Sequence, residues 1–171
     1  LLELDALEGI SAEELQQIVN FSIGPTPELI GTEGDDVLTG TNRSEIISGL
    51  GGNDLLQGLG GNDTISGGNG NDLIAAGNGN DSVTGETGSD RISGNDGNDV
   101  INTGSGNDYS DGGKGNDTIS AVSGNDLIVT FAKNAILTAP ETNTIYGGTG
   151  TDTLLYFSNF SDLKIARTAT G

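Results

Sequence analysis

Apolar residues recur at every ninth position between Gly31 and Val129, and polar, glycine-rich segments separate them. Within each nonapeptide the fourth residue is usually Gly, the sixth is usually Asp and the eighth is usually aliphatic, with no insertion or deletion across this range. The eighth positions hold Leu38, Ile47, Leu56, Ile65, Ile74, Val83, Ile92, Ile101, Ser110, Ile119 and Ile128. Self-similarity at a fixed short period predicts a solenoid, in which each unit buries its apolar residue against neighbouring units.

Each aliphatic residue is the middle of a short triplet such as Thr64–Ser66. Alternation along a strand points the middle side chain inward and its two neighbours outward. The remaining residues of the unit are rich in Gly, Asn and Asp, which favour turns and tolerate left-handed backbone conformations. Such short strands cannot form a hairpin meander, but two nonapeptides can form one flattened coil whose strands pair with their equivalents eighteen residues away. The sequence therefore predicts an all-β fold, a right-handed parallel β-roll.

Residues 1–30 lie outside the repeat. Ser11 and Glu14 fit a capping box, and the apolar residues that follow predict a short helix over Ala12–Asn20. Solenoids need their ends covered, so we expect residues 1–30 to form an N-terminal cap. A helix that binds a partner is the alternative.

The period holds over residues 31–129 and loosens over 130–171, where Ala135 stands at the place of an expected Asp. Leu137, Ile145 and Leu154 continue the aliphatic column at spacings of nine, eight and nine residues. The segment 147–152 resembles one more loop. We expect residues 130–171 to form degenerate coils and a C-terminal cap, within a single structural domain.

The composition narrows the possible partners. Among 171 residues there are 25 acidic and 6 basic ones, a net charge of −19, and no Cys or His. So acidic a chain is not expected to bind nucleic acid or to insert into membranes. Without thiolates or imidazoles, the available ligands are carboxylate and carbonyl oxygens, which suit a hard divalent cation. No catalytic constellation is visible, and because the chain begins at Leu1 rather than Met we expect it to belong to a larger protein.

Alternate loops of such a coil share a side, which stacks the sixth-position carboxylates in two columns. The first column is Asp36, Asp54, Asp72, Asp90, Asp108 and Asp126, and the second is Glu45, Asp63, Asp81, Asp99 and Asp117. Carboxylates at that spacing repel by energies on the order of kcal/mol, whereas a dication between neighbours would cross-link them. Adjacent pairs predict about eight ions, which nearly balance the net charge of −19. The Glu45/Asp63 pair is not counted, because Arg43 replaces the loop glycine.

The unit GGNGNDLIA at 67–75 and its neighbours resemble the calcium-binding nonapeptide repeats of RTX (repeats-in-toxin, haemolysin-type) proteins. The resemblance is strong over 31–129 and weak over 143–155. It implies that each Ca²⁺ lies between two loops of one side and binds both Asp carboxylates. It also implies that the shell is completed by carbonyls at positions 2 and 4 of the earlier loop and positions 1 and 3 of the later loop.

The resemblance can be mapped onto each pair of loops. On the first side the implied carbonyls belong to Thr32, Gly34, Gly49, Leu50, Gly51, Gly52, Gly67, Gly68, Asn69, Gly70, Gly85, Glu86, Thr87, Gly88, Thr103, Gly104, Ser105, Gly106, Ala121 and Ser123. On the second side they belong to Leu59, Gly61, Ala76, Gly77, Asn78, Gly79, Gly94, Asn95, Asp96, Gly97, Gly112 and Lys114. Some residues depart from the pattern: Thr103 and Ala121 replace the first glycine, and Ser110 replaces the aliphatic residue near Asp108.

These features predict a calcium-binding module of a secreted, extracellular protein. The resemblance implies export by a type I secretion machinery, with the chain unfolded in the cytosol and folding on Ca²⁺ outside the cell. Alternatives are a non-catalytic module of a secreted enzyme, of the protease, lipase or alginate-epimerase type, or part of a surface adhesin. A metal-free solenoid with purely structural loops does not explain why unpaired carboxylates are stacked.

Two further features have open alternatives. The fifth-position asparagines could be side-chain ligands, or could be favoured because Asn tolerates a positive φ, which is the interpretation we prefer. They are Asn53, Asn62, Asn71, Asn80, Asn98, Asn107, Asn116 and Asn125. In addition, Val37, Leu55 and Leu73 form an apolar stripe on the outside of one sheet. We expect this stripe to receive the N-terminal helix, and a partner surface is the alternative.

Overall fold

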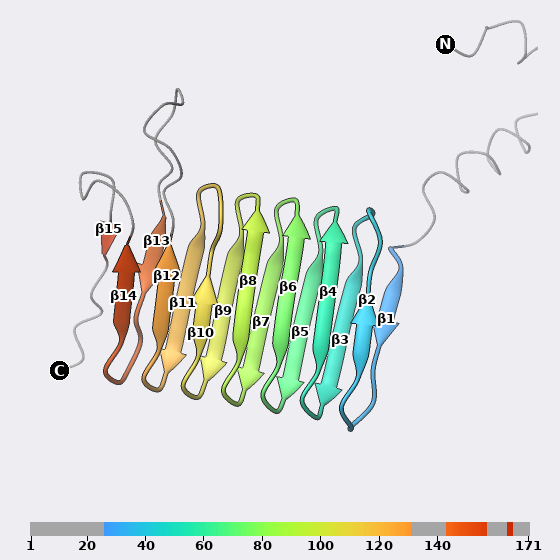
Figure 1. Ribbon diagram of the computed structural model, residues 1–171, viewed down its shortest axis with the longest axis horizontal. Helices are drawn as coiled ribbons and strands as arrows, with labels where there is room; N and C mark the ends of the chain where they lie inside the picture. The colour runs from blue at the N-terminus through green and yellow to red at the C-terminus, as the bar shows by residue number, and fades with distance from the viewer. Residues whose placement is uncertain (1–25, 131–142, 157–163, 166–171) are drawn as a thin grey trace, which may run out of the picture.

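The chain winds as a flattened coil that sends successive strands alternately to two parallel sheets (Figure 1). The computed structural model describes residues 26–130, 143–156 and 164–165. One sheet contains, in spatial order, β1 (Glu28–Ile30), β3 (Ile46–Gly51), β5 (Thr64–Asn69), β7 (Ser82–Thr87), β9 (Val100–Ser105), β11 (Thr118–Ser123), β13 (Thr144–Tyr146) and β15 (Lys164–Ile165). The other contains β2 (Val37–Thr39), β4 (Leu55–Gly60), β6 (Leu73–Asn78), β8 (Arg91–Asp96), β10 (Tyr109–Asp111), β12 (Leu127–Thr130) and β14 (Thr153–Tyr156). The predicted parallel β-roll is confirmed.

Strands pair in parallel with their equivalents eighteen residues away, as the period predicts. Ile47 is opposite Ile65, and Ile65 is opposite Val83. This register holds from β1 to β12 in both sheets, apart from a local shift in β11 where Ala121 is opposite Gly104. Alternate loops therefore stack along the same edge of the roll.

The strands are longer than the predicted triplets. Most have six residues, because positions 1 to 3 of the next repeat continue the pairing, as Leu59 with Gly77 shows. The turn itself is confined to positions 4 to 6. Positive φ angles occur at positions 2 and 4, for example 107° at Gly68 and 130° at Gly70. Leu50, Leu59, Glu86 and Asn95 adopt positive φ at position 2 despite having side chains.

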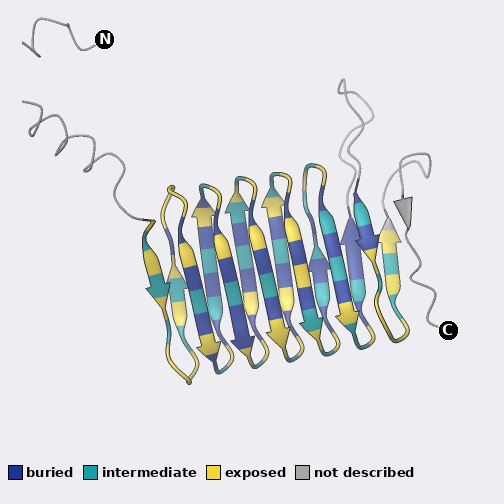
Figure 2. Ribbon diagram, turned by 180° about the vertical axis from the view of Figure 1, so that it is seen from behind, coloured by how far each residue is buried: buried dark blue, intermediate teal, exposed yellow. Residues whose placement is uncertain are grey.

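The eighth-position side chains form the buried core, as predicted. Figure 2 shows buried residues recurring along the strands of the roll. From Ile47 to Ile128 the aliphatic ones are at most 2 % exposed, and Leu38 and Leu154 are partly buried near the ends. Ser110 takes its place in this column between Ile92 and Ile128 and is equally buried. The core is therefore a ladder of single aliphatic residues, each stabilised mainly by its neighbours in the stack.

The register changes after β12. Ile145 pairs with Ile119, and Leu154 pairs with Ile128, both over twenty-six residues rather than eighteen. Among the described strands β13 is the immediate neighbour of β11, so Ile145 follows Ile119 in the same aliphatic column. Leu137, expected to continue the column, lies outside the described residues, so its place stays a prediction.

The predicted apolar stripe lies on the outer face of the seven-stranded sheet. Val37, Leu55 and Leu73 are opposite one another in register, and Val37 is 72 % exposed. The next two rungs hold Arg91, whose guanidinium carbon lies 4.0 Å from the ring centroid of Tyr109. The helix expected over 12–20 lies outside the described residues, so its docking onto this stripe stays a prediction. Within the described ranges, no helix is long and apolar enough to span a bilayer.

Position 4 is expected to tolerate no side chain inside the stack. A Cβ on Gly70 would overlap the carbonyl oxygen of Gly52, and its φ of 130° disfavours any other residue. Gly70→Ala should therefore lower the unfolding free energy by about 2 kcal/mol or more. Gly34 occupies the same position in the first repeat, but the nearest atom to a Cβ there is 3.8 Å away. Denaturant unfolding of the calcium-loaded variants should find Gly34→Ala near wild type; an equal loss would contradict the close approach.

Candidate metal sites

The sixth-position carboxylates form two buried columns, one along each edge of the roll. From Asp54 to Asp126 on the first side and from Asp63 to Asp117 on the second, each residue is at most 3 % exposed. Asp36, at the start of the first column, is half-buried. The stacking predicted from the nine-residue period is therefore present in the structure.

One oxygen of each carboxylate links successive coils. The N–H of Asp54 donates to Oδ1 of Asp72 at 2.8 Å, and the N–H of Asp72 donates to Oδ1 of Asp90 at 2.9 Å. The second column repeats this bond between Asp63 and Asp81 at 2.8 Å. Each carboxylate thus satisfies a buried backbone donor of the preceding coil, which fixes the orientation of the side chain.

The other carboxylate oxygen points into the loop and accepts no hydrogen bond among the described residues. This applies to Oδ2 of Asp54, Asp63, Asp72, Asp81, Asp90, Asp99, Asp108 and Asp126. Burying a charged oxygen without a partner is costly, and a row of such atoms needs an explanation. Bound cations would supply one, because they are the partners that a carboxylate oxygen prefers.

Backbone oxygens converge with these carboxylates at position 1. A Cβ on Gly31 would stand 2.7 Å from Oδ2 of Asp36 and 2.7 Å from the carbonyl oxygen of Gly49. At Gly67 the corresponding neighbours are Oδ2 of Asp72 and the carbonyl oxygen of Gly85. Oxygens from two loops of one side therefore approach the bare Cα of the first glycine. This arrangement fits an oxygen-ligated cation held between successive loops.

The other implied carbonyls have identifiable roles in the stack. The position-4 carbonyl of Gly52 points at the Cα of Gly70 in the next loop. The position-3 carbonyl of Asn69 accepts the N–H of Gly52 at 2.9 Å. Each carbonyl has two lone pairs, so one hydrogen bond does not prevent metal ligation. Across the described part of the chain, no three carboxylates gather in a metal-sized group, so a site here would take most of its shell from backbone carbonyls.

At the N-terminal end, two threonines close the carboxylate columns. Oδ2 of Asp36 accepts both the N–H of Thr32 at 2.6 Å and its hydroxyl at 2.9 Å. The N–H of Thr41 donates to Oε2 of Glu45 at 3.1 Å, and the Thr41 hydroxyl donates to Oε1 of the same carboxylate. Thr occupies position 2 only in these first two repeats of the regular array, which is the signal in the sequence for this role. The terminal carboxylates are therefore partnered without a metal.

At the C-terminal end, the structure corrects the residue that continues each column. The N–H of Asp117 donates to Oδ1 of Asn143 at 2.7 Å, so Asn143 and not Ala135 takes the next place. The N–H of Asp126 donates to Oδ1 of Asp152 at 3.2 Å, which adds a carboxylate pair beyond those counted from the sequence. Both links span twenty-six residues, like the strand pairs beside them.

The fifth-position asparagines have a role that neither sequence interpretation contained. Their φ angles are not positive, so the preferred interpretation was wrong. Instead the N–H of Asn71 donates to Oδ1 of Asn53 at 2.9 Å, and the N–H of Asn80 donates to Oδ1 of Asn62 at 2.8 Å. This ladder runs along both edges outside the aspartates, so these side-chain oxygens already serve the backbone. Only the coil-to-coil register reveals the bond, because the partners are eighteen residues apart.

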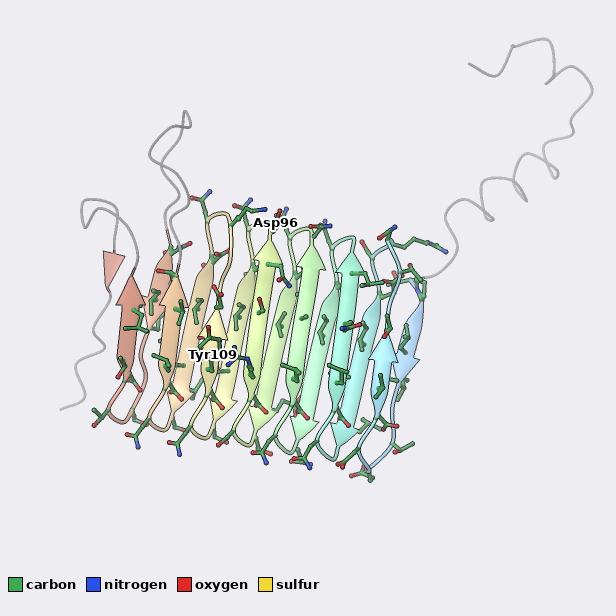
Figure 3. All side chains as sticks on the ribbon, viewed as in Figure 1. Asp96 and Tyr109 are labelled. Atoms are coloured by element: carbon green, nitrogen blue, oxygen red, sulfur yellow. The ribbon has the colours of Figure 1, made fainter. Side chains whose placement is uncertain are left out.

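Asp96 and Lys114, predicted only through their carbonyls, also form a salt bridge across the second edge. Figure 3 shows Asp96 at the edge where β8 ends and Tyr109 on the outer face of the sheet. The two charged side chains are 47 % and 45 % exposed, so their ion pair contributes little to stability. The salt bridge nevertheless places the positively charged ammonium group of Lys114 beside the second carboxylate column.

Burial shapes the titration of the columns. Loss of solvent raises the pKa of Asp63, Asp72, Asp81 and Asp126, although a backbone N–H bonded to each carboxylate opposes the shift. Near the centre, burial raises the pKa of Asp90 to about 6 and that of Asp99 to about 7, and neighbouring carboxylates add to both shifts. In the metal-free roll, the most buried of these carboxylates therefore bind protons close to neutral pH.

The metal-free chain is accordingly expected to gain structure in acid. The folded-state pKa of Asp99 lies above its ordinary value of 3.8, so the folded state binds more protons than the unfolded state. This contribution to stability is complete below about pH 4 and is lost as the pH rises through about 7. Circular dichroism in EDTA should show more β signal at acidic than at neutral pH, and less pH dependence in Asp99→Asn. A signal that grows with rising pH would contradict this sign.

Comparison with known sequences places these loops in context. The sequence model of the RTX calcium-binding nonapeptide repeat (4 copies) matches residues 28–42, 39–74, 75–109, 102–130 and 141–155. These matches cover more than half of the chain and include every carboxylate of both columns, Asp152 among them. No curated protein matches the sequence.

Proposed function

Because the chain belongs to the RTX calcium-binding nonapeptide repeat family, we propose that it is the calcium-dependent folding module of a secreted protein. The observation that carries this proposal is the set of buried Oδ2 atoms that accept no hydrogen bond among the described residues, those of Asp54, Asp72, Asp90, Asp108 and Asp126 in the first column and of Asp63, Asp81 and Asp99 in the second. Calcium would supply the positive charge that a chain of net charge −19 lacks. Since the columns exist only when coils stack, binding energy becomes folding energy.

The Ca²⁺ ions would lie between neighbouring loops of one side. On the first side we assign them to the pairs from Asp54/Asp72 to Asp108/Asp126, and on the second side to the pairs from Asp63/Asp81 to Asp99/Asp117. Asp126/Asp152 is a further pair on the same geometry. Asp36/Asp54 is the weakest, because Thr32 already partners the Asp36 carboxylate. The carbonyls at positions 1 to 4 would complete each shell.

The number of bound ions tests the pair at the C-terminal end. Native mass spectrometry at saturating calcium should find about nine ions on the wild-type chain. Asp152→Ala is expected to lose one ion, because it removes one carboxylate of the last pair on the first side. Asn143→Ala is the matched control on the second side, where Asn143 offers no charge, and should keep the count. Loss of an ion from both variants, or from neither, would reject the assignment of Asp126/Asp152.

The proposed site of folding is outside the cell, after export through a type I machinery. Repulsion within the columns favours the unfolded state where calcium is scarce, and extracellular modules bind calcium at about 10⁻⁴–10⁻³ M. A calcium titration followed by circular dichroism should therefore have its midpoint in that range. A midpoint below about 10⁻⁷ M would mean that the chain folds before export. Any catalytic activity of the parent protein would lie outside these residues.

A further inference from the structure

Inside the stack, position 4 of the loop imposes a glycine, whatever residue precedes it. Gly70 and Gly79 have φ angles of 130° and 133°, and a Cβ on either would overlap a carbonyl oxygen of the preceding loop. Position 3 is free to vary, and holds Thr87 or Ser105 elsewhere in the first column of loops. Where position 3 is Asn and position 4 lies inside the stack, the fold therefore creates an Asn-Gly pair, whereas Asn42 in the second repeat is followed by Arg43. The sequence contains two, Asn69-Gly70 and Asn78-Gly79.

We propose that Asn69 and Asn78 are sites of spontaneous deamidation that the folded roll protects and the unfolded chain exposes. The backbone nitrogen of the following glycine attacks the side-chain amide carbon, and the amide nitrogen leaves as ammonia. The product is a five-membered succinimide ring, and the step involves no oxidation or reduction. Water then opens it at one of two carbonyls, giving aspartate or isoaspartate. Glycine favours this attack because it places no side chain beside the nucleophilic nitrogen.

In the roll the attacking nitrogens are occupied. The N–H of Gly70 donates to the carbonyl oxygen of Thr87 at 2.8 Å, and the N–H of Gly79 donates to that of Asp96 at 2.8 Å. The Asn69 side chain is also held, since its Oδ1 accepts the hydroxyl of Thr87 at 2.8 Å. Both asparagines end paired strands, β5 and β6. Ring closure therefore requires the loop to open first, which makes the reaction rate follow the population of open states.

Deamidation would damage the structure that prevents it. An aspartate at position 3 adds a negative charge to a chain that already carries −19. Isoaspartate additionally routes the main chain through the side-chain carbon, which lengthens one nonapeptide and breaks its register with the loops on either side. This consequence rests on the proposed calcium-dependent folding: a chain kept without calcium stays unfolded, accumulates deamidation and progressively loses the ability to fold.

Peptide mapping by mass spectrometry tests this inference on the whole chain. Samples kept at mildly alkaline pH in calcium or in EDTA are digested, and the small mass increase from amide to acid is followed at each asparagine. Conversion at Asn69 and Asn78 should be at least about tenfold faster in EDTA. Asn62 and Asn71, which precede aspartates, are internal controls and should change little. Equal rates with and without calcium would overturn the proposal.

Two further arms separate this inference from the proposed function. Urea-unfolded chain in the presence of calcium should deamidate as fast as the EDTA sample, whatever role calcium has in folding. If EDTA leaves the chain folded, calcium dependence fails, but slow deamidation there and fast deamidation in urea would still support protection by the roll. The fraction of wild type that refolds when calcium is restored should decline during EDTA exposure in step with conversion at Asn69 and Asn78. A decline without conversion at these positions would reject these two sites as its cause.

Discussion

Adding calcium to the metal-free chain at neutral pH should convert a disordered coil into the parallel β-roll, and EDTA should reverse the change. Without the metal, each column buries a row of carboxylates that repel one another, and the small core of single aliphatic residues cannot offset that cost. Far-UV circular dichroism should report the gain of β structure. The radius of gyration from X-ray scattering should fall by about half.

Magnesium is the matched control for this switch. It demands small octahedral sites and retains several waters, so it should not replace calcium in a shell built mainly from backbone carbonyls. Ionic strength is held constant, because screening alone weakens repulsion between exposed charges. A chain equally folded in EDTA, or folded equally well by magnesium at the same concentration, would contradict calcium as the folding ligand.

Removing Asp72 is expected to cost two neighbouring calcium sites, whereas removing Asp36 should cost one at most. Asp72 lies between Asp54 and Asp90 in the first column, and Asp36 is the first carboxylate of that column. Asp72→Ala also leaves the buried N–H of Asp54 without its acceptor, a further loss of about 1–3 kcal/mol. Calcium counts by native mass spectrometry and denaturant unfolding in calcium should both rank Asp72→Ala below Asp36→Ala.

Asp72→Asn separates the two tasks of this carboxylate. The amide oxygen can still accept the Asp54 N–H, but the negative charge at the metal position is gone. We expect Asp72→Asn to bind fewer ions, like Asp72→Ala, while losing less stability where calcium is limiting. Equal calcium binding by wild type and Asp72→Asn would show that the unpartnered Oδ2 does not serve a metal. Equal losses of ions in Asp36→Ala and Asp72→Ala would contradict binding between stacked loops.

The regular part of the candidate site was predictable because the repeat has no insertion. Once two nonapeptides form a coil, the eighteen-residue spacing alone decides that Asp54 neighbours Asp72 and that Ile47 packs near Ile65. The same reasoning failed at Ala135, because the register shifts to twenty-six residues after β12. Where the repeat is interrupted, the local pattern does not predict how many residues separate one strand from the next strand of the same sheet.

By itself, the sequence determined the period, the two sides, the aliphatic core and the pairing of aspartates within each column. These follow from the alternation of a strand and the length of one coil, which are local properties. Only the tertiary structure decided which carboxylate oxygen bonds the next coil and which stays without a hydrogen bond, and that Asn53 accepts the N–H of Asn71. It also showed Thr32 closing one end of the first column and Asp152 extending the other. Each of these depends on hydrogen bonds or side-chain directions at the loops, which the stacking of coils sets and the period does not encode.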